Sequence, residues 1–180
     1  MAHKSRSDHG QTSKEPSPFL TDNISILPPG RVLDIAMGSG RNALYLASRG
    51  YDVEGVDISP EAVQNALEAA DQARVALKAL VGNLETSYRI APRAYDLIIC
   101  FNYLQRSLIP QIKNGLRDNG VVMYETYTIE QARFGKPSNP EYLLKPNELL
   151  HLFSDFLCLR YHEGIMDGPR AAAGLIARKQ

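Results

Sequence analysis

Two aspartates and a glycine-rich turn stand at the ends of apolar segments, in a pattern that can bind a small charged ligand. Asp34 lies within the apolar run 31–37, and the turn 38–40 (Gly-Ser-Gly) follows that run directly. Glycines at such a turn let the backbone approach a ligand closely and point amides at it from the start of the next helix. Asp57 lies near the end of the next apolar run, where a carboxylate can accept hydrogen bonds from both ribose hydroxyls. The pattern is typical of a site for a ribose-containing cofactor.

The turn fits two classes of cofactor. The segment 38–43 (GSGRNA) satisfies the dinucleotide pattern G-x-G-x-x-G/A, in which a pyrophosphate lies on the turn. Asp34, four residues before Gly38, would repel a pyrophosphate but attract the cationic amino acid part of S-adenosylmethionine. Asp57 supports both cofactors, because both contain ribose. Asp34 therefore favours S-adenosylmethionine, and its alternative interpretation is a simple turn-capping role.

Other residues near these strand ends have two interpretations each. Asn83 and Leu84 follow the third apolar run and could border an adenine, through hydrogen bonds and apolar contact respectively. An ordinary turn role explains Asn83 equally well. Asp57 could also be an acid stabilised by the helix dipole near Ser59 and Pro60, although its position at a strand end favours the ribose role.

Apolar runs alternate with helical segments along most of the chain, which predicts a parallel sheet with right-handed crossovers. Ser59, Pro60 and Glu61 give a helix start with a cap, a proline at the first helical position and an acid in the first turn. Only the short MDGPR segment joins the last two runs, so these must be antiparallel. The predicted strands are 31–37, 51–59, 75–83, 95–101, 121–128, 156–165 and 171–179; the predicted helices are 41–49, 60–73, 107–116 and 147–153, with a turn at 117–120.

The composition suits one globular domain without overall charge. Twenty basic and twenty acidic residues balance in a chain of 180, so no global field draws it to nucleic acid or anionic lipid. Residues 1–17 are polar and predict a flexible leader, followed by one domain over 18–180. Cys100 and Cys158 lie in apolar runs and are expected to be buried, reduced thiols. Because the start of the sequence has no apolar secretory segment and no apolar run reaches ~20 residues, we expect a cytoplasmic protein.

The segment 33–59, LDIAMGSGRNALYLASRGYDVEGVDIS, resembles the first motif and the ribose motif of class I S-adenosylmethionine-dependent methyltransferases. It is most similar to the tellurite-resistance-type (TehB-like) methyltransferases, whose G-R-N-x-L-Y-L-A run is matched by residues 40–47. A weaker likeness extends over about residues 16–179. The resemblance implies an α/β fold with a Rossmann-like, doubly wound, seven-stranded sheet of order 3-2-1-4-5-7-6. The last strand would be antiparallel, and helices on both faces would complete three α-β-α layers.

The resemblance also implies roles for individual residues around S-adenosyl-L-methionine and its product, S-adenosyl-L-homocysteine. Asp34 and the turn 36–40 would face the methionine part, and Asp57 the ribose. Ile58 and the pair 83–84 would surround the adenine, while Phe101 and Asn102, at the end of the fourth strand, would lie beneath the sulfonium. The implied cofactor-binding residues are Asp34, Ala36, Met37, Gly38, Ser39, Gly40, Asn42, Asp57, Ile58, Asn83, Leu84, Phe101 and Asn102.

Two departures from this family pattern bear on the site. Ala36 stands where the class usually has glycine; its methyl group is tolerated if the residue keeps a negative φ, but it crowds the cofactor slightly. Tellurite-type enzymes carry a His-Arg pair in the loop before their last strand. Here the corresponding loop is short and leaves only Arg170 and the upstream His162, so tellurite is not the expected substrate.

The acceptor side offers fewer signals than the cofactor side. A thiolate, selenide or carboxylate acceptor needs no base, whereas a hydroxyl or an ammonium does. His162 is the best candidate for a base, with a structural role as its alternative. Four cations could make the pocket receptive to an anion, with solvated surface charge as the alternative for each: Arg106, Arg133, Lys136 and Arg170. Glu125 points from the end of the fifth strand, where open sheets bind ligands. The predicted catalytic residues are therefore His162, Arg106 and Arg170, and no metal is expected.

Three hypotheses for the function follow. The first is a methyltransferase acting on a small molecule, such as a thiol, a chalcogen or another soft or anionic nucleophile. The second is an NAD-dependent oxidoreductase, favoured only by the literal glycine pattern, and the third is a non-catalytic protein that binds an adenosine ligand. Enzymes that methylate base amines have prolines after strand four, which the segment 101–104 (FNYL) lacks. We therefore expect a small-molecule substrate, no nucleic acid or membrane partner, and a monomer or homodimer.

Overall fold

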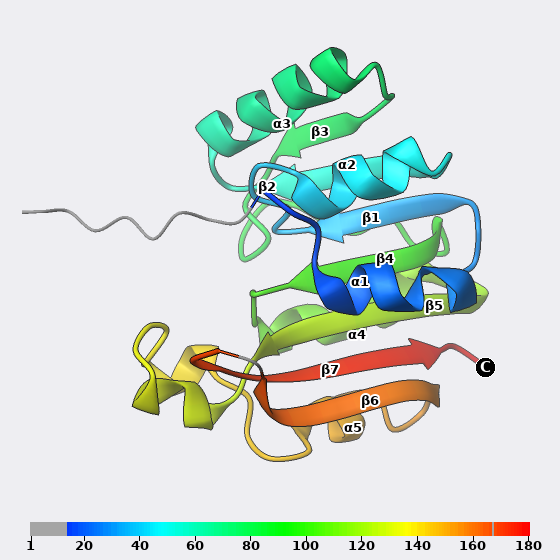
Figure 1. The fold of residues 1–180 in the computed structure, drawn as a ribbon. Helices are drawn as coiled ribbons and strands as arrows, with labels where there is room; N and C mark the ends of the chain where they lie inside the picture. Colours follow the sequence, from blue (N-terminus) through cyan, green and yellow to red (C-terminus); the bar gives the residue numbers. More distant parts are fainter. Residues whose placement is uncertain (1–13, 167) are drawn as a thin grey trace, which may run out of the picture.

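A seven-stranded mixed sheet forms the centre of the molecule in the computed structural model, which describes residues 14–166 and 168–180 (Figure 1). The sheet order is β3-β2-β1-β4-β5-β7-β6, with β1 to β5 parallel and β7 antiparallel to both of its neighbours. The predicted strand order and the antiparallel last strand are therefore confirmed. The strands are β1 (Arg31–Ile35), β2 (Asp52–Asp57), β3 (Lys78–Val81), β4 (Tyr95–Phe101), β5 (Leu116–Tyr127), β6 (Leu157–Met166) and β7 (Arg170–Arg178).

Helices cover both faces of this sheet, and each face has its own core (Figure 1). Along β4, Leu97 and Ile99 pack with the first two helices, whereas Ile98 between them packs with a helix on the opposite face. This alternation explains why the parallel strands read as continuous apolar runs. Cys100 on β4 is buried as predicted, whereas the prediction that Cys158 is buried is wrong, because it lies exposed on β6 at the sheet edge. None of the helices in the described ranges is long and apolar enough to cross a membrane. The α-helices are α1 (Pro18–Asn23), α2 (Arg41–Ser48), α3 (Pro60–Ala73), α4 (Ile109–Gly115) and α5 (Glu148–Leu152); the 3-10 helices are η1 (Ile24–Ile26), η2 (Arg106–Leu108), η3 (Ile129–Arg133) and η4 (Pro140–Tyr142).

The start of α3 follows the predicted signals. The Ser59 side chain accepts a hydrogen bond from the backbone N–H of Ala62 at 3.2 Å, with Pro60 at the first helical position and Glu61 in the first turn. The cap fixes where the chain leaves β2, so the end of that strand and its aspartate have a defined position beside the glycine turn.

Two predicted elements differ from the observed ones by more than two residues at one end. The third strand was predicted over 75–83 but covers only Lys78–Val81 at the sheet edge, where most of its side chains are exposed. The predicted turn at 117–120 lies inside β5, as an irregularity between the pairings of Tyr95 with Leu116 and of Leu97 with Val121. Backbone pairing on both sides of that irregularity extends the strand beyond the apolar run that indicated it.

Contacts with the domain begin before the predicted boundary at residue 18. Of the predicted leader, residues 1–13 lie outside the described residues. The backbone N–H of Ser17 donates to Asn42 Oδ1 at 2.8 Å, and the Ser17 side chain is buried. Arg41 donates to the carbonyl oxygen of Glu15 at 3.2 Å. The segment that precedes α1 is therefore attached to the first turn of α2.

Candidate functional site

The glycine turn connects β1 to α2 through three residues in the left-handed region. Ala36, Gly38 and Gly40 have φ values of 53°, 57° and 79°. A Cβ at Gly38 would meet no atom within 4 Å, so the space beside this residue is open, whereas a Cβ at Gly40 would lie 2.9 Å from the side chain of Ala66. The two glycines have different roles: Gly38 leaves room beside the turn, and Gly40 lets α2 approach α3.

Ala36 does not meet the condition of a negative φ under which its methyl group is tolerated. Its φ of 53° lies in a region that costs an L-residue with a side chain roughly 1–2 kcal/mol relative to the right-handed region. The adjacent pairing explains the conformation, because the backbone N–H of Met37 still bonds to the carbonyl oxygen of Val56 at 3.1 Å. The chain must therefore turn sharply between the end of β1 and that bond. This requirement accounts for the glycine that the family usually has here.

Asp34 is a buried carboxylate with incomplete pairing. The residue is 2% exposed, and its Oδ2 atom has no hydrogen-bond partner in the described part of the chain. Burial raises the pKa of Asp34 to about 8, although a hydrogen bond from the Ala43 backbone and the charge of Arg41 oppose the shift. Such a group is costly unless a partner arrives, and the partner that suits a carboxylate is a cation or a hydrogen-bond donor.

Asp57 holds the turn from the neighbouring strand. Its Oδ2 accepts the backbone N–H of Gly38 at 2.8 Å, and its Oδ1 accepts the N–H of Ser59 at 2.9 Å. The carboxylate is half-buried at the end of β2, beside the open space at Gly38. Each carboxylate oxygen can accept a further hydrogen bond, so the geometry leaves capacity for a ribose hydroxyl.

The residues predicted around an adenine do not all face open space. Ile58 is 64% exposed, whereas Leu84 is buried in the core on the α4 face. Asn83 Oδ1 accepts the backbone N–H of Glu85 at 2.8 Å, which is the turn role that the sequence allowed. Ile58 is therefore the one member of this group with an apolar surface free to contact a ligand.

The ends of β4 and β5 lie side by side, since Phe101 pairs with Glu125 in the sheet. Phe101 is 7% exposed, and Asn102 beyond it has a φ of 58° and donates its backbone N–H to the Glu125 carbonyl oxygen at 2.8 Å. The Asn102 side chain accepts a hydrogen bond from Arg170 Nη2 at 3.1 Å. This connects the predicted sulfonium region with the start of β7.

The Glu125 carboxylate contacts two of the three predicted catalytic residues, His162 and Arg170. Its side chain is 4% exposed; Arg170 Nη2 lies 2.7 Å from Oε1, and His162 Nε2 lies 3.3 Å from Oε2. Burial by itself would raise the pKa of Glu125, but His162 and Arg170 hold it below its ordinary value. The sequence indicated each residue separately. Their contact depends on the register that aligns Glu125, Gly174 and His162 across three strands, which the sequence does not specify.

Arg106, the third predicted catalytic residue, makes a different set of contacts. Nε and Nη2 bind both oxygens of Glu148 at 2.6 and 2.9 Å. Nη1 and Nη2 also donate to the carbonyl oxygens of Glu141 and Leu143 at 2.8 and 2.9 Å. The guanidinium therefore connects the irregular segment before α5 to η2. These contacts favour a structural role for Arg106 over the predicted catalytic role.

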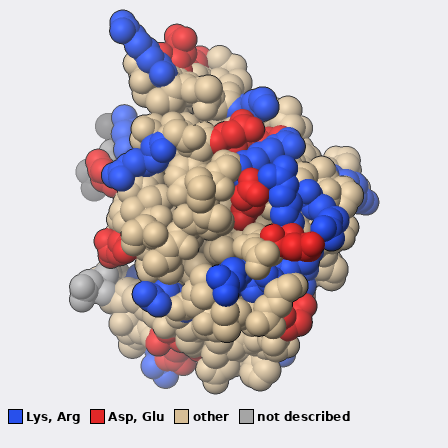
Figure 2. Space-filling model, turned by 90° about the vertical axis from the view of Figure 1, so that its right-hand side faces the viewer, with Lys and Arg blue, Asp and Glu red and all other residues tan. Residues whose placement is uncertain are grey.

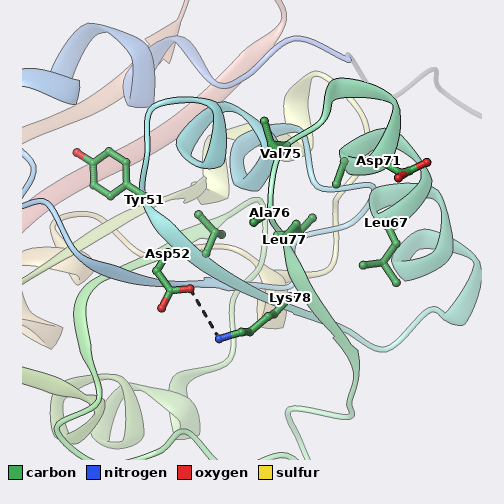
Figure 3. A pocket seen from close by; sticks show the side chains of 10 residues that line it. Tyr51, Asp52, Leu67, Asp71, Val75, Ala76, Leu77 and Lys78 are labelled. Carbon is green, nitrogen blue, oxygen red and sulfur yellow. Dashed lines mark ion pairs between the residues drawn. The ribbon is translucent and has the colours of Figure 1, made fainter.

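A separate pocket opens at the opposite end of the sheet (Figure 3). It has a volume of about 360 Å³ and lies where β2 and β3 begin, beside α3. Asp52 and Lys78 form an exposed ion pair of 3.8 Å at its rim. Apolar side chains make up much of the rest of its wall, and it is remote from both strand-end carboxylates. The lining residues are Tyr51, Asp52, Val53, Leu67, Ala70, Asp71, Val75, Ala76, Leu77 and Lys78.

No group of three or more His, Cys, Asp or Glu side chains that could hold a metal ion occurs within residues 14–166 and 168–180. The chemistry available at the carboxyl ends of the strands is therefore that of carboxylates, an imidazole and a guanidinium around a glycine turn. Open α/β sheets bind their ligands at this end.

The chain is similar to known proteins over most of its length. The family described as tellurite resistance protein TehB matches residues 11–173. Hemagglutinin 1 of Eikenella corrodens is 26% identical over 163 residues, which are 87% of this chain and 53% of that protein. The probable S-adenosyl-L-methionine-dependent methyltransferase TehB of Haemophilus influenzae (strain ATCC 51907) is 25% identical over 154 residues, covering 81% of this chain and 52% of that protein. The chain thus spans about half the length of these curated relatives.

A solved structure of a TehB protein has the same fold as this chain. The crystal structure of TehB from Haemophilus influenzae superposes with a TM-score of 0.76 at 23% identity, covering 89% of this chain and 61% of that one. At this identity the likeness shows the shared fold, including the sheet whose strand ends carry the glycine turn.

Proposed function

The chain belongs to the tellurite resistance protein TehB family, and from this premise we propose that it is a methyltransferase that uses S-adenosyl-L-methionine and acts on a small molecule. The proposed cofactor site lies at the carboxyl ends of β1, β2 and β4. There the open turn at Gly38, the half-buried Asp57 and the buried Asp34 lie on neighbouring strands.

The observation that carries this proposal is the buried, incompletely paired carboxylate of Asp34. An unpaired buried oxygen marks a place where a donor is missing, and the amino group of a methionine moiety would supply both a donor and a positive charge. A pyrophosphate would bring a second negative charge to the same place. The carboxylate therefore supports S-adenosyl-L-methionine over NAD, and no specific contact in the structure favours the oxidoreductase.

Each residue of the proposed site has a task that its geometry allows. When bound, the cofactor supplies a methyl group already activated on a sulfonium, so the protein contributes positioning and exclusion of water. Asp57 orients the turn through Gly38 and accepts ribose hydroxyls with its remaining lone pairs. Phe101 gives an apolar floor beside Asn102 at the end of β4.

The charges around the acceptor side bear on the class of acceptor. The sequence indicated a soft or anionic nucleophile because several cations follow the strand ends. In the structure Arg106, Arg133 and Arg170 each form an ion pair with a carboxylate. An anion would have to compete with those carboxylates, so the charges favour a small acceptor without a net negative charge.

Isothermal calorimetry with S-adenosyl-L-homocysteine and with NAD tests the proposal. We expect saturable binding of S-adenosyl-L-homocysteine at equimolar stoichiometry and no heat of binding with NAD. Binding of NAD with no response to S-adenosyl-L-homocysteine would refute the cofactor assignment. If S-adenosyl-L-homocysteine binds, transfer of radiolabel from S-adenosyl-L-methionine to a small molecule separates an enzyme from a non-catalytic binder.

A further inference from the structure

The cluster around Glu125 suggests the chemistry of the acceptor. The carboxylate lies at the end of β5, directly beside Phe101 in the sheet, and it is almost fully buried. Arg170 occupies one oxygen and His162 the other, at 2.7 and 3.3 Å. A buried carboxylate held between two cationic or proton-carrying groups is arranged to orient them and to stabilise positive charge on them.

The imidazole of His162 reaches Glu125 by crossing β7 above Gly174. A Cβ at Gly174 would lie 2.3 Å from His162 Nε2, so only glycine leaves room for the ring. Phe19 of α1 contacts the ring, with 4.6 Å between centroids. The approach of Nε2 to the carboxylate is a close contact rather than an aligned hydrogen bond. Catalytic hydrogen bonds of this kind often tighten only when substrate is bound.

The other ring nitrogen of His162 has no such constraint. Nε2 is buried against Glu125, whereas Nδ1 has no hydrogen-bond partner among residues 14–166 and 168–180. With a proton on Nε2 facing the carboxylate, a neutral imidazole presents its lone pair at Nδ1. On β6 itself, the Tyr161 hydroxyl donates to Glu163, so that carboxylate already has a donor of its own. The charged group that contacts the imidazole is therefore Glu125, and Arg170 in turn pairs with Glu125.

We propose that the acceptor is a neutral hydroxyl compound of the phenol type, whose proton passes to His162 while Glu125 orients and stabilises the imidazole. This inference rests on the proposed methyltransferase function. In the step, the acceptor oxygen forms a bond to the methyl carbon as the carbon–sulfur bond breaks. The electron pair of the broken bond stays on sulfur, and the hydroxyl proton moves to Nδ1 of His162 and then to water. Glu125 is a positioning residue, because it acts through His162.

The reaction is tested with a defined mixture of catechol, 2-mercaptoethanol and sodium tellurite, using radiolabelled S-adenosyl-L-methionine. We expect transfer to catechol to exceed transfer to the thiol and to tellurite, with one proton released per methyl group. Any other distribution of label, including none, overturns the acceptor class. A wild-type protein that does not bind S-adenosyl-L-homocysteine would instead defeat the proposed function, so the two failures are distinguishable.

Variants test the roles of the two residues. His162→Gln should lower kcat by about 100-fold or more while the Kd for S-adenosyl-L-homocysteine stays within about 2-fold. His151→Gln, on the exposed side of α5, is the matched histidine control and should leave both values unchanged. Glu125→Asp should retain more activity than Glu125→Gln. Equal activity of wild type and His162→Gln would overturn the role of the base.

One readout distinguishes orientation by Glu125 from simple structural support. Nitrogen NMR of the ring should show the proton on Nε2 in the wild type and a mixture of tautomers in Glu125→Gln. An unchanged tautomer in Glu125→Gln would overturn the positioning role.

Discussion

Two carboxylates at opposite ends of the sheet, Glu54 and Asp34, are paired to different extents. At the end where the parallel strands begin, Glu54 accepts hydrogen bonds from Arg31, Tyr95 and Tyr88 at 2.8, 2.9 and 3.1 Å. Burial alone would raise the pKa of Glu54, but these donors hold it below its ordinary value. Figure 2 views this end and shows basic and acidic side chains interleaved across it. At the other end, Asp34 is buried with one oxygen unpaired, and its pKa is raised to about 8.

The difference bears on where a ligand is needed. A carboxylate with three protein donors has no need of a ligand, and it stabilises the folded chain by itself. A carboxylate without enough donors weakens the folded chain until a partner supplies them. The comparison of Glu54 with Asp34 therefore supports the proposed ligand site at the carboxyl ends of the strands, independently of the likeness to known proteins.

The largest expected effect is the pH dependence caused by Asp34. Its folded pKa lies above the unfolded value of 3.8, so the folded state holds a proton that the unfolded state releases. Stability from this group is complete below about pH 4 and is lost as pH rises toward about pH 8. Between about pH 5 and about pH 8, the free energy of unfolding of the wild type should fall by at most roughly 4 kcal/mol relative to Asp34→Asn. Urea denaturation of both proteins at the two pH values measures this.

Although the ionised Asp34 carboxylate lowers the free energy of unfolding, it should strengthen cofactor binding. Asp34→Asn should weaken the affinity for S-adenosyl-L-homocysteine by at least about 10-fold, because the ammonium group loses its counter-charge. Wild-type binding near neutral pH should release a proton, visible as a dependence of the calorimetric heat on the buffer. A heat that is the same in all buffers would contradict the raised pKa of Asp34.

Glu54 should have the next largest effect, on stability alone. Glu54→Ala removes the acceptor of Arg31, Tyr88 and Tyr95, and we expect a loss of about 3 kcal/mol in the free energy of unfolding at neutral pH. Because the folded pKa of Glu54 is lowered, its contribution is present above the ordinary pKa and disappears as pH falls below that value. The folded variant should bind S-adenosyl-L-homocysteine as the wild type does. Weakened binding in the folded variant would break the division between the two ends.

Asp57 and Asp52 stand at opposite ends of one strand and offer a matched pair. Asp57→Ala removes the acceptor of the Gly38 and Ser59 amides and the proposed ribose contact, and should weaken S-adenosyl-L-homocysteine binding by over ~1.4 kcal/mol. Asp52→Ala removes only an exposed ion pair with Lys78 and should leave affinity unchanged. Equal affinities of the two folded variants, measured by calorimetry, would refute the ribose assignment.

The smallest expected effect concerns Ala36. Ala36→Gly relieves a left-handed conformation but adds freedom to the unfolded chain, so we expect a gain of about 1 kcal/mol or less in the free energy of unfolding. Thermal denaturation measures the change, and Ala47→Gly inside α2 is the control, since it should destabilise. A loss of stability in Ala36→Gly would contradict the left-handed conformation.

Much of the fold could be predicted from local patterns in the sequence. The apolar runs of β1, β2 and β4 and the cap at Ser59 depend on nearby residues, and the structure has them as predicted. The edge strand β3 is shorter than its apolar run because little packs against an edge. The early start of β5 depends on backbone pairing with Tyr95, which side-chain patterns do not report.

Candidate site residues near a recognisable motif in the sequence could be predicted, whereas contacts between residues on different strands far apart in the sequence could not. Asp34 was predicted because it lies four residues before Gly38, and Asp57 because it lies at the end of the second strand, 23 residues after Asp34. The contact of Glu125 with His162 and Arg170 joins residues 37 and 45 positions apart, through the register of a hairpin and the absence of a side chain at Gly174. Arg106 was assigned to catalysis because its charge is visible in the sequence, while its partner Glu148 becomes apparent only in space.

The contacts of Arg106 have a consequence for how specificity could change in this family. One guanidinium joins the carboxylate of Glu148 and the carbonyl oxygens of Glu141 and Leu143 to η2, and the next residue, Leu144, pairs with the backbone of Tyr127 and Ile129. At the other end of the same segment, the Gln131 side chain accepts the backbone N–H of Ala171. The mostly exposed stretch 132–142 is therefore held at both of its ends, so exchanges within it would alter the surface after β5 without changing the strands, which makes it a target for redesigning substrate choice.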